Sequence, residues 1–362
     1  MATNPAQQSR SESASGVTDA APLTGDPHAD QIAAEMRAGR QASGIGPYRL
    51  AMRRLRRNKT ALVFGLIFVV IVVLCLLAPV YSHDIAHIGP NDNNVSGQVH
   101  VGNKLEDVVS ANGLPIGPTW HSRYFLGADP NGRDVAVRLL YGGRNSLLIG
   151  FIATLITTFF ATILGLISGY FRGVTDGVLS RVFDVIWAYP VLLLGIALGT
   201  ALALGGFKVG PISIQGNSLL IPALIIGFVY IPYLAKPIRG QVLSLREKEF
   251  VDAARAQGFS PIRIMLTEVL PNLSSTIIVF FPLIVANAIL LEAGLSYLGA
   301  GVQPPNPSWG TMISQGINLL PAAFHLTIVP GLMLVLCVLG INVFGDGVRD
   351  ALDPRAKVRI EH

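Results

Sequence analysis

The sequence predicts an all-α integral membrane protein with six transmembrane helices. Three observations predict this fold: only 14% of the 362 residues are charged, 51% are hydrophobic, and the charged residues leave long gaps between them. Soluble domains are about one-quarter charged, and a helix needs about 20 apolar residues to cross the hydrocarbon core of a bilayer. Helices are the expected form because every backbone amide in lipid must be hydrogen-bonded internally.

Six stretches without Asp, Glu, Lys or Arg are long enough to hold these helices. Five of them are 23 to 27 residues long and hold one span each. The sixth covers 53 residues between Glu292 and Asp346 and is too long for a single helix. Its proline-rich part near Pro304 predicts a loop before an apolar stretch resumes near Leu326. The expected spans are 61–80, 146–168, 180–204, 218–236, 275–298 and 326–345.

Two different segments precede the first span. Residues 1–46 are polar and hold no apolar run, which predicts a disordered cytoplasmic tail. Residues 47–60 are basic and amphipathic, which predicts an interfacial helix in contact with membrane lipid. A nucleic-acid-binding arm is the alternative interpretation of 47–60. The adjacent span disfavours it, so we expect no nucleic-acid partner.

The distribution of Lys and Arg predicts the orientation. If both termini are cytoplasmic, 21 of the 27 basic residues fall on the inner side. The extracytoplasmic loop 81–144 then contains Arg133, Arg138 and Arg144, which oppose the rule locally and indicate a specific structural role. We expect an amphipathic helix within Asp129–Arg144 at the outer membrane face.

The largest inner loop, 236–274, contains the pattern of a short helix. Phe250, Ala253, Ala254 and Gln257 share one helical face with small side chains at its centre. Gly258 is expected to end this helix. The dipeptide Ser260–Pro261 is typical of the start of a second helix. Small side chains would let another protein approach closely, whereas an ordinary linking helix is the alternative.

Polar residues inside spans are costly and are candidates for function. Asn287 and Glu292 are therefore possible pathway residues, with an internal ion pair or a salt bridge to a partner as the alternative for Glu292. For Asp184 we expect an i, i+3 pair with Arg181. No metal site is expected, because His83, Asp84 and His87, whose spacing could ligate a metal, lie on a polar loop with no fourth ligand.

Several segments resemble the permeases of ABC importers. Asp252-Ala253-Ala254, Gly258 and Leu270-Pro271 are similar to the EAA loop of that family, with Asp252 in place of its Glu. Further blocks are similar to the C-type permease subunit of the subclass that imports dipeptides and oligopeptides and, in some members, nickel or glutathione. These blocks are Arg53–Lys59, Leu126–Leu147, Leu295–Gly310 and Gly345–Arg355.

The resemblance implies a permease core at 146–357, a tail at 358–362 and a location in the bacterial inner membrane. It implies as partners a second homologous permease, two cytoplasmic ATP-binding subunits, an extracytoplasmic substrate-binding protein and a peptide substrate. The loop 236–274 would couple ATP hydrolysis to transport. Its contact residues would be Glu249, Phe250, Asp252, Ala253, Ala254, Gly258, Phe259 and Pro271.

We expect the chain itself not to be an enzyme and to hold no cofactor. It lacks the phosphate-binding motif G-x-x-x-x-G-K-[ST], so ATP and Mg²⁺ would belong to the partner subunits. Three alternatives differ in class or substrate: import of nickel, glutathione or another small solute, an ATP-independent channel or secondary transporter, and an intramembrane enzyme. The last is disfavoured because no paired catalytic groups or H-E-x-x-H motif occur in the spans.

Overall fold

The computed structural model describes residues 47–102 and 104–352. The chain divides into two units, Met1–Leu50 and Ala51–His362. The first unit is described only at 47–50, where helix α2 (Pro47–Leu55) begins. The predicted tails 1–46 and 358–362, with the last residues of the predicted core, lie outside the described residues.

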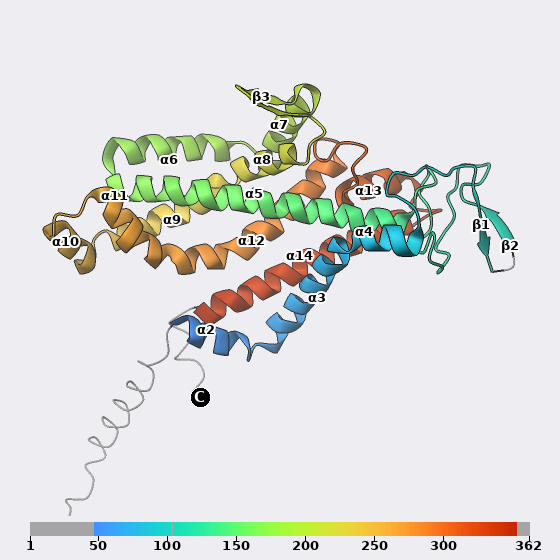
Figure 1. The fold of residues 1–362 in the computed structure, drawn as a ribbon. Helices are drawn as coiled ribbons and strands as arrows, with labels where there is room; N and C mark the ends of the chain where they lie inside the picture. The colour runs from blue at the N-terminus through green and yellow to red at the C-terminus, as the bar shows by residue number, and fades with distance from the viewer. Residues whose placement is uncertain (1–46, 103, 353–362) are drawn as a thin grey trace, which may run out of the picture. The chain divides into compact units, whose positions relative to one another are not determined.

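The first half of the second unit contains long helices separated by small hairpins (Figure 1). Helix α3 is followed by short helical turns, the antiparallel pair β1–β2 and the 37-residue helix α5. Helices α6 and α7 and the pair β3–β4 follow. The bounds are α3 Lys59–Leu76, α4 Ala78–Val80, η1 Tyr81–Ala86, β1 Gln98–Val101, β2 Lys104–Asp107, α5 Val135–Phe171, α6 Gly173–Ala188, α7 Val191–Gly205, β3 Phe207–Val209 and β4 Ile212–Ile214.

The second half is helical throughout its regular elements. Its bounds are α8 Leu220–Val229, α9 Ile231–Leu245, α10 Glu249–Ala256, α11 Pro261–Ile264, η2 Met265–Val269, α12 Leu270–Tyr297, α13 Trp309–Gly316, η3 Ile317–Leu319 and α14 His325–Leu352. The prediction of a mostly helical protein is confirmed. The two hairpins, which the sequence analysis did not predict, lie outside the long apolar helices.

Five helices in the described part of the chain are long and apolar enough to cross a membrane, or up to six if one bent pair counts as a span. The bent pair is α6–α7, whose axes differ by 86°. The expectation of one straight helix at 180–204 is therefore wrong. Pro190 lacks a backbone N–H, and Tyr189 before it takes an extended conformation, so the helix breaks there.

Other predicted bounds were too narrow, because the charge-free gaps mark apolar residues rather than helix ends. Helix α5 begins at Val135 rather than at 146, so the end of the predicted loop 81–144 is a continuous part of it. Helices α8–α9 extend to Leu245. The next apolar helix already begins at Pro261. The predicted loop 236–274 therefore shrinks to about 246–260.

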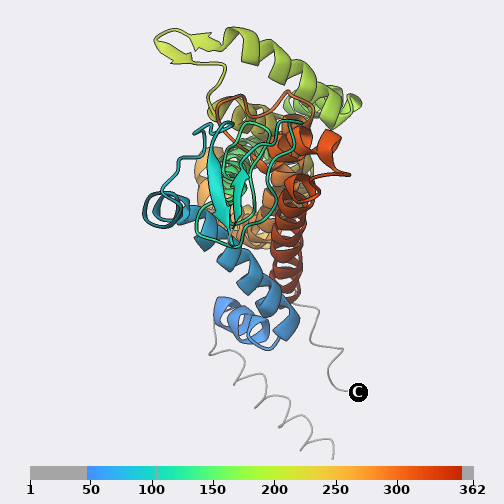
Figure 2. The same ribbon diagram turned by 90° about the vertical axis from the view of Figure 1, so that its right-hand side faces the viewer.

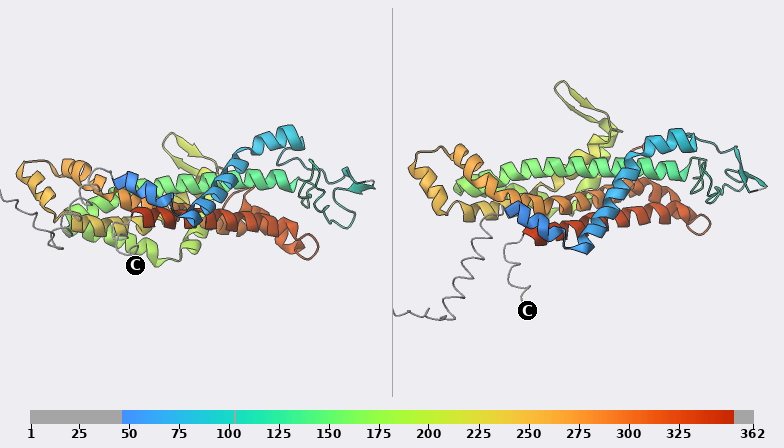
Figure 3. Two further views of the ribbon diagram at one scale, coloured as in Figure 1. Left: turned by 90° about the horizontal axis from the view of Figure 1, so that it is seen from below. Right: turned by 60° about the horizontal axis from the view of Figure 1, so that its bottom comes forward.

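Helix α5 lies at the centre of the packing and contacts both α9 and α12. The views of Figures 2 and 3 also place α3 across α14. The close approach of α5 to α9 depends on glycine. A Cβ atom at Gly165 would lie 2.9 Å from the carbonyl oxygen of Ala235, and one at Gly169 would lie 2.8 Å from that of Arg239. Small residues at such crossings let helix backbones pack directly.

Two of the three outer arginines make structural contacts beside the start of α5, whereas Arg144 is exposed on that helix. Arg133 forms an ion pair of 2.6 Å with Asp129 and donates a hydrogen bond to Gln315 of α13. Arg138 is buried and donates to the carbonyl oxygen of Pro90. Arg133 thus attaches the residues before α5 to α13, and Arg138 attaches α5 to the loop at Pro90. The helix expected within Asp129–Arg144 begins only after its N-cap Asp134.

Candidate functional site

The predicted loop helix exists as α10, and its end is well defined. Gln257 is its C-cap, and Gly258 follows with a φ of +79°. The amide of Gly258 donates to the carbonyl of Arg255, and the amide of Phe259 donates to that of Ala254. This pair of hydrogen bonds is the Schellman motif. The predicted helix end at Gly258 is therefore confirmed, as is the N-cap at Ser260, whose side chain accepts from the Arg263 amide.

One side of α10 packs against the rest of the chain. Val251 is fully buried and Ala254 is 3% exposed, and both belong to a core cluster with Ile264 and Leu273. Phe259 packs against the same cluster and stacks under the guanidinium of Arg263 at 3.8 Å. Ala254 and Phe250 were predicted to share one face, but Ala254 is buried against its own chain whereas Phe250 is exposed.

The other side of α10 is exposed. Its members include Glu249, Phe250, Asp252, Ala253 and Gln257. Phe250 is a large apolar side chain that is 37% exposed although a core lies one residue away. Asp252 forms an i, i+3 ion pair with Arg255 at 2.9 Å. The predicted residue Pro271 is also exposed, in the first turn of α12. The exposed face thus carries one large aromatic ring, a residue type that is enriched at protein interfaces.

Tyr170 near the end of α5 connects α10 to the long helix. Its ring centroid lies 5.8 Å from the guanidinium carbon of Arg255 in α10 and 5.9 Å from that of Arg246 after α9. Arg246 also donates a hydrogen bond to the Tyr170 carbonyl. The sequence analysis missed Tyr170, because no local pattern relates it to residues more than 70 positions later.

This contact predicts a change in protease sensitivity. Tyr170→Leu removes two cation–π contacts of about 0.5–2 kcal/mol in total and should loosen α10 from α5. Trypsin should then cleave faster at Lys248 and Arg255, as measured by a time course on the purified protein. Tyr170→Phe keeps the ring and should behave like the unmodified chain. Equal cleavage rates for the Leu and Phe variants would contradict this role of the ring.

Ion pairs fasten helix α6 to its neighbours. Arg239 of α9 donates two hydrogen bonds to Asp176, of 2.5 and 2.6 Å, and Ser168 of α5 donates a third. Asp184 pairs with Lys236 at 2.8 Å. The predicted ion pair between Asp184 and Arg181 was therefore wrong, because Asp184 pairs with a residue of α9 instead.

A further ion pair joins the α5–α6 turn to the residues before α10. Arg172 pairs with Glu247, and its hydrogen bond lowers the pKa of that carboxyl. The start of the loop 246–260 is thus held against the turn between α5 and α6.

The two possible pathway residues occupy different environments in α12. Asn287 is half-buried, and its backbone carbonyl accepts from the Tyr230 hydroxyl at 3.4 Å. Glu292 is fully buried, and its Oε1 accepts from Ser296 at 2.6 Å. Among the described residues, no ion pair includes Glu292, so the internal ion pair weighed for it is not formed there. A pathway role for either residue stays a prediction.

The chain has clear relatives of known class. A family model described as "binding-protein-dependent transport system inner membrane component" matches residues 161–358. A model for the N-terminal transmembrane domain of oligopeptide transport permease C matches residues 46–98. The sequence is 36% identical to the dipeptide transport system permease protein DppC of Alkalihalophilus pseudofirmus, over 88% of this chain and 93% of the relative.

A second relative and one solved structure are also similar to this chain. The glutathione transport system permease protein GsiD of Pectobacterium atrosepticum is 32% identical over 86% of this chain and 92% of its own length. A solved structure of the MetNI methionine ABC transporter superposes with a TM-score of 0.49 and 16% identity, covering 60% of this chain and 96% of the other. From its family match and these relatives, the chain belongs to the inner membrane components of binding-protein-dependent transport systems.

Proposed function

We propose that this chain is one of two permease subunits of an ATP-driven importer of short peptides. The relatives named above as dipeptide and glutathione permeases support this substrate class, because glutathione is itself a short peptide. A binding protein would deliver the peptide from outside. ATP and Mg²⁺ would be held by two partner subunits on the cytoplasmic side.

The observation that carries the proposal is the exposed face of α10. It presents Phe250 and Ala253 outward while Val251 and Ala254 fix the helix to the core. Because α10 is packed against the core, a movement of a docked ATP-binding subunit would be transmitted through α10 to the helix bundle. In Figure 1, α10 and the β1–β2 hairpin lie at opposite ends of α5. Helix α5 would therefore connect the ATP-binding side with the side that receives the binding protein.

The proposed topology counts α6–α7 as one broken span, which gives six spans. An even number places both termini on the same side of the membrane. The distribution of 21 of the 27 basic residues supports the cytoplasmic side for both. The loop 246–260 would then face the ATP-binding subunits.

Ala253→Arg tests this docking face. A bulky charged side chain beside Phe250 overpacks a contact between proteins, at a typical cost of about 1–3 kcal/mol. We expect about ten-fold lower recovery of the ATP-binding subunits in a pull-down, with normal insertion of the permease.

Ala111→Arg is the matched control. Ala111 is exposed in the loop between β2 and α5, outside the loop 246–260, so the same substitution there should leave the recovery of the ATP-binding subunits unchanged. Ala254→Arg would not test docking, because Ala254 is buried against its own chain. Normal recovery and normal peptide uptake with Ala253→Arg would make α10 an ordinary connector.

A further inference from the structure

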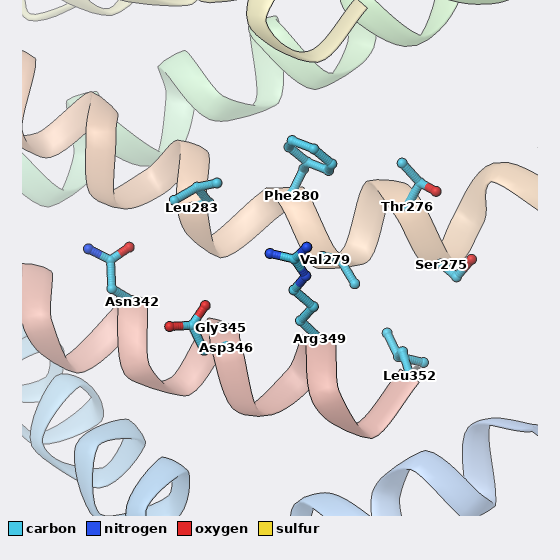
Figure 4. A pocket seen from close by; sticks show the side chains of 10 residues that line it. All are labelled: Ser275, Thr276, Val279, Phe280, Leu283, Asn342, Gly345, Asp346, Arg349 and Leu352. Carbon is cyan, nitrogen blue, oxygen red and sulfur yellow. The ribbon is translucent and has the colours of Figure 1, made fainter. Parts of the chain in front are cut away.

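A cavity of about 270 Å³ lies between α12 and α14 (Figure 4). It is smaller than the pockets of about 300–1,000 Å³ that hold drug-sized ligands. Its walls combine charged, polar and apolar side chains from the two helices. The lining residues include Ser275, Val279, Leu283, Asn342, Asp346 and Arg349.

Two opposite charges lie in this cavity without neutralising each other. Asp346 and Arg349 are one turn apart on α14, a spacing at which oppositely charged side chains often pair. Neither forms an ion pair with any residue of 47–102 or 104–352. Figure 4 shows Arg349 extending from α14 toward α12, with Asp346 beside it. The cavity therefore offers one site for an anion and a separate site for a cation.

The remaining lining residues suit the uncharged middle part of a small polar molecule. Val279 and Leu283 provide apolar lining on α12, while Ser275 and Asn342 provide hydrogen-bonding groups on the two sides (Figure 4). In Figure 4, the ring of Phe280 points away from α14, and it packs against Tyr233. Thr276 is fixed by donating its hydroxyl to Gln241 of α9. Such a lining matches a small molecule with charged ends, amide groups and apolar side chains.

We propose that this cavity binds the zwitterionic form of a short peptide. Arg349 binds the terminal carboxylate, because a guanidinium donates paired hydrogen bonds to a carboxylate. Asp346 binds the terminal ammonium group, and the apolar wall receives a side chain. This inference rests on the proposed function and adds a peptide site within the permease itself, near the end of α14.

A phospholipid headgroup also carries opposite charges and is the competing occupant. The hydroxyl and amide groups of Ser275 and Asn342 favour the peptide, because its amide groups would hydrogen-bond with them whereas acyl chains would not. The volume of about 270 Å³ also fits a small molecule better than a lipid with two acyl chains.

The test is equilibrium binding of radiolabelled Ala-Phe to the complete purified importer without its binding protein. We expect N-acetyl-Ala-Phe and Ala-Phe-amide to bind about ten-fold more weakly than Ala-Phe, because each lacks one charge. Asp346→Asn should remove the discrimination against the acetylated peptide alone. Arg349→Gln should remove the discrimination against the amide alone. Asp350→Asn, exposed on α14 and outside the cavity, is the matched control and should change neither ratio.

Uptake of Ala-Phe into proteoliposomes with the binding protein distinguishes a failure of the cavity site from a failure of the proposed function. If the unmodified importer takes up the peptide but binding ignores the blocked ends or the two substitutions, the cavity site is wrong and the proposed function stands. Bound phospholipid that peptide does not displace would also overturn the site. If the unmodified importer takes up no peptide, the proposed function itself fails.

Discussion

Replacing Trp309 by alanine should destabilise the protein by about 3–5 kcal/mol, the range for truncating a buried Trp. Trp309 is fully buried at the start of α13, and its Nε1 donates to the carbonyl of Leu139 at 3.1 Å. A Cβ atom at Gly143 would lie 2.6 Å from its ring, so the ring fills the space that the glycine leaves. Truncation would leave a cavity between α5 and α13 that the rigid helices cannot close.

The measurement is the loss of monodisperse protein on heating in detergent. Trp120→Ala is the control, because Trp120 is 68% exposed and contacts mainly Phe125. It should change Tm little. Trp309→Phe should fall between the two, since it keeps most of the volume and loses the N–H. If both alanine variants lowered Tm equally, the buried ring would not be a centre of stability.

The sequence predicted local features well because their causes are local. Gly258 at a helix end and Ser260 at a helix start depend on the conformations and hydrogen bonds of adjacent residues. The charge-free gaps located five long apolar helices of the described chain for the same reason, whereas the helix predicted at 180–204 is broken. The gaps could not give the helix ends, since α5 continues through the charged residue Arg144 to Val135.

Features that depend on packing between distant segments could not be predicted. Helical periodicity placed Ala254 and Phe250 on one face, but only the tertiary structure shows that the core covers Ala254. The partner of Asp184 is Lys236, and no spacing rule relates residues 52 positions apart. The cavity residues Asp346 and Arg349 belonged to a segment recognised only by resemblance. Their relation to α12 became visible once the two helices were placed together.

Glu292 shows the same limit most clearly. A carboxyl in an apolar span suggested a pathway residue, yet the structure places it fully inside the chain. Its Oε1 accepts from the hydroxyl of Ser296, and the Ser296 oxygen accepts from the amide of Val302 at 2.9 Å. The Oε2 of Glu292 is buried without a hydrogen-bond partner among the described residues. Through Ser296, Glu292 thus links the end of α12 to the loop that precedes α13.

Glu292→Ala should therefore destabilise the protein by about 2–4 kcal/mol, because it opens a void and leaves the buried hydroxyl of Ser296 without its acceptor. Glu292→Gln keeps the shape and a hydrogen-bonding oxygen. This variant should lose less than about 1 kcal/mol of stability, since the Glu292 carboxylate forms no ion pair with the described residues. Thermal unfolding of both variants measures these costs, and peptide uptake per folded complex separates stability from transport. Near-normal uptake by the Gln variant would assign Glu292 to the structure of the bundle. A stable Gln variant without uptake would instead return the carboxyl to the transport pathway, as its position in the span first suggested.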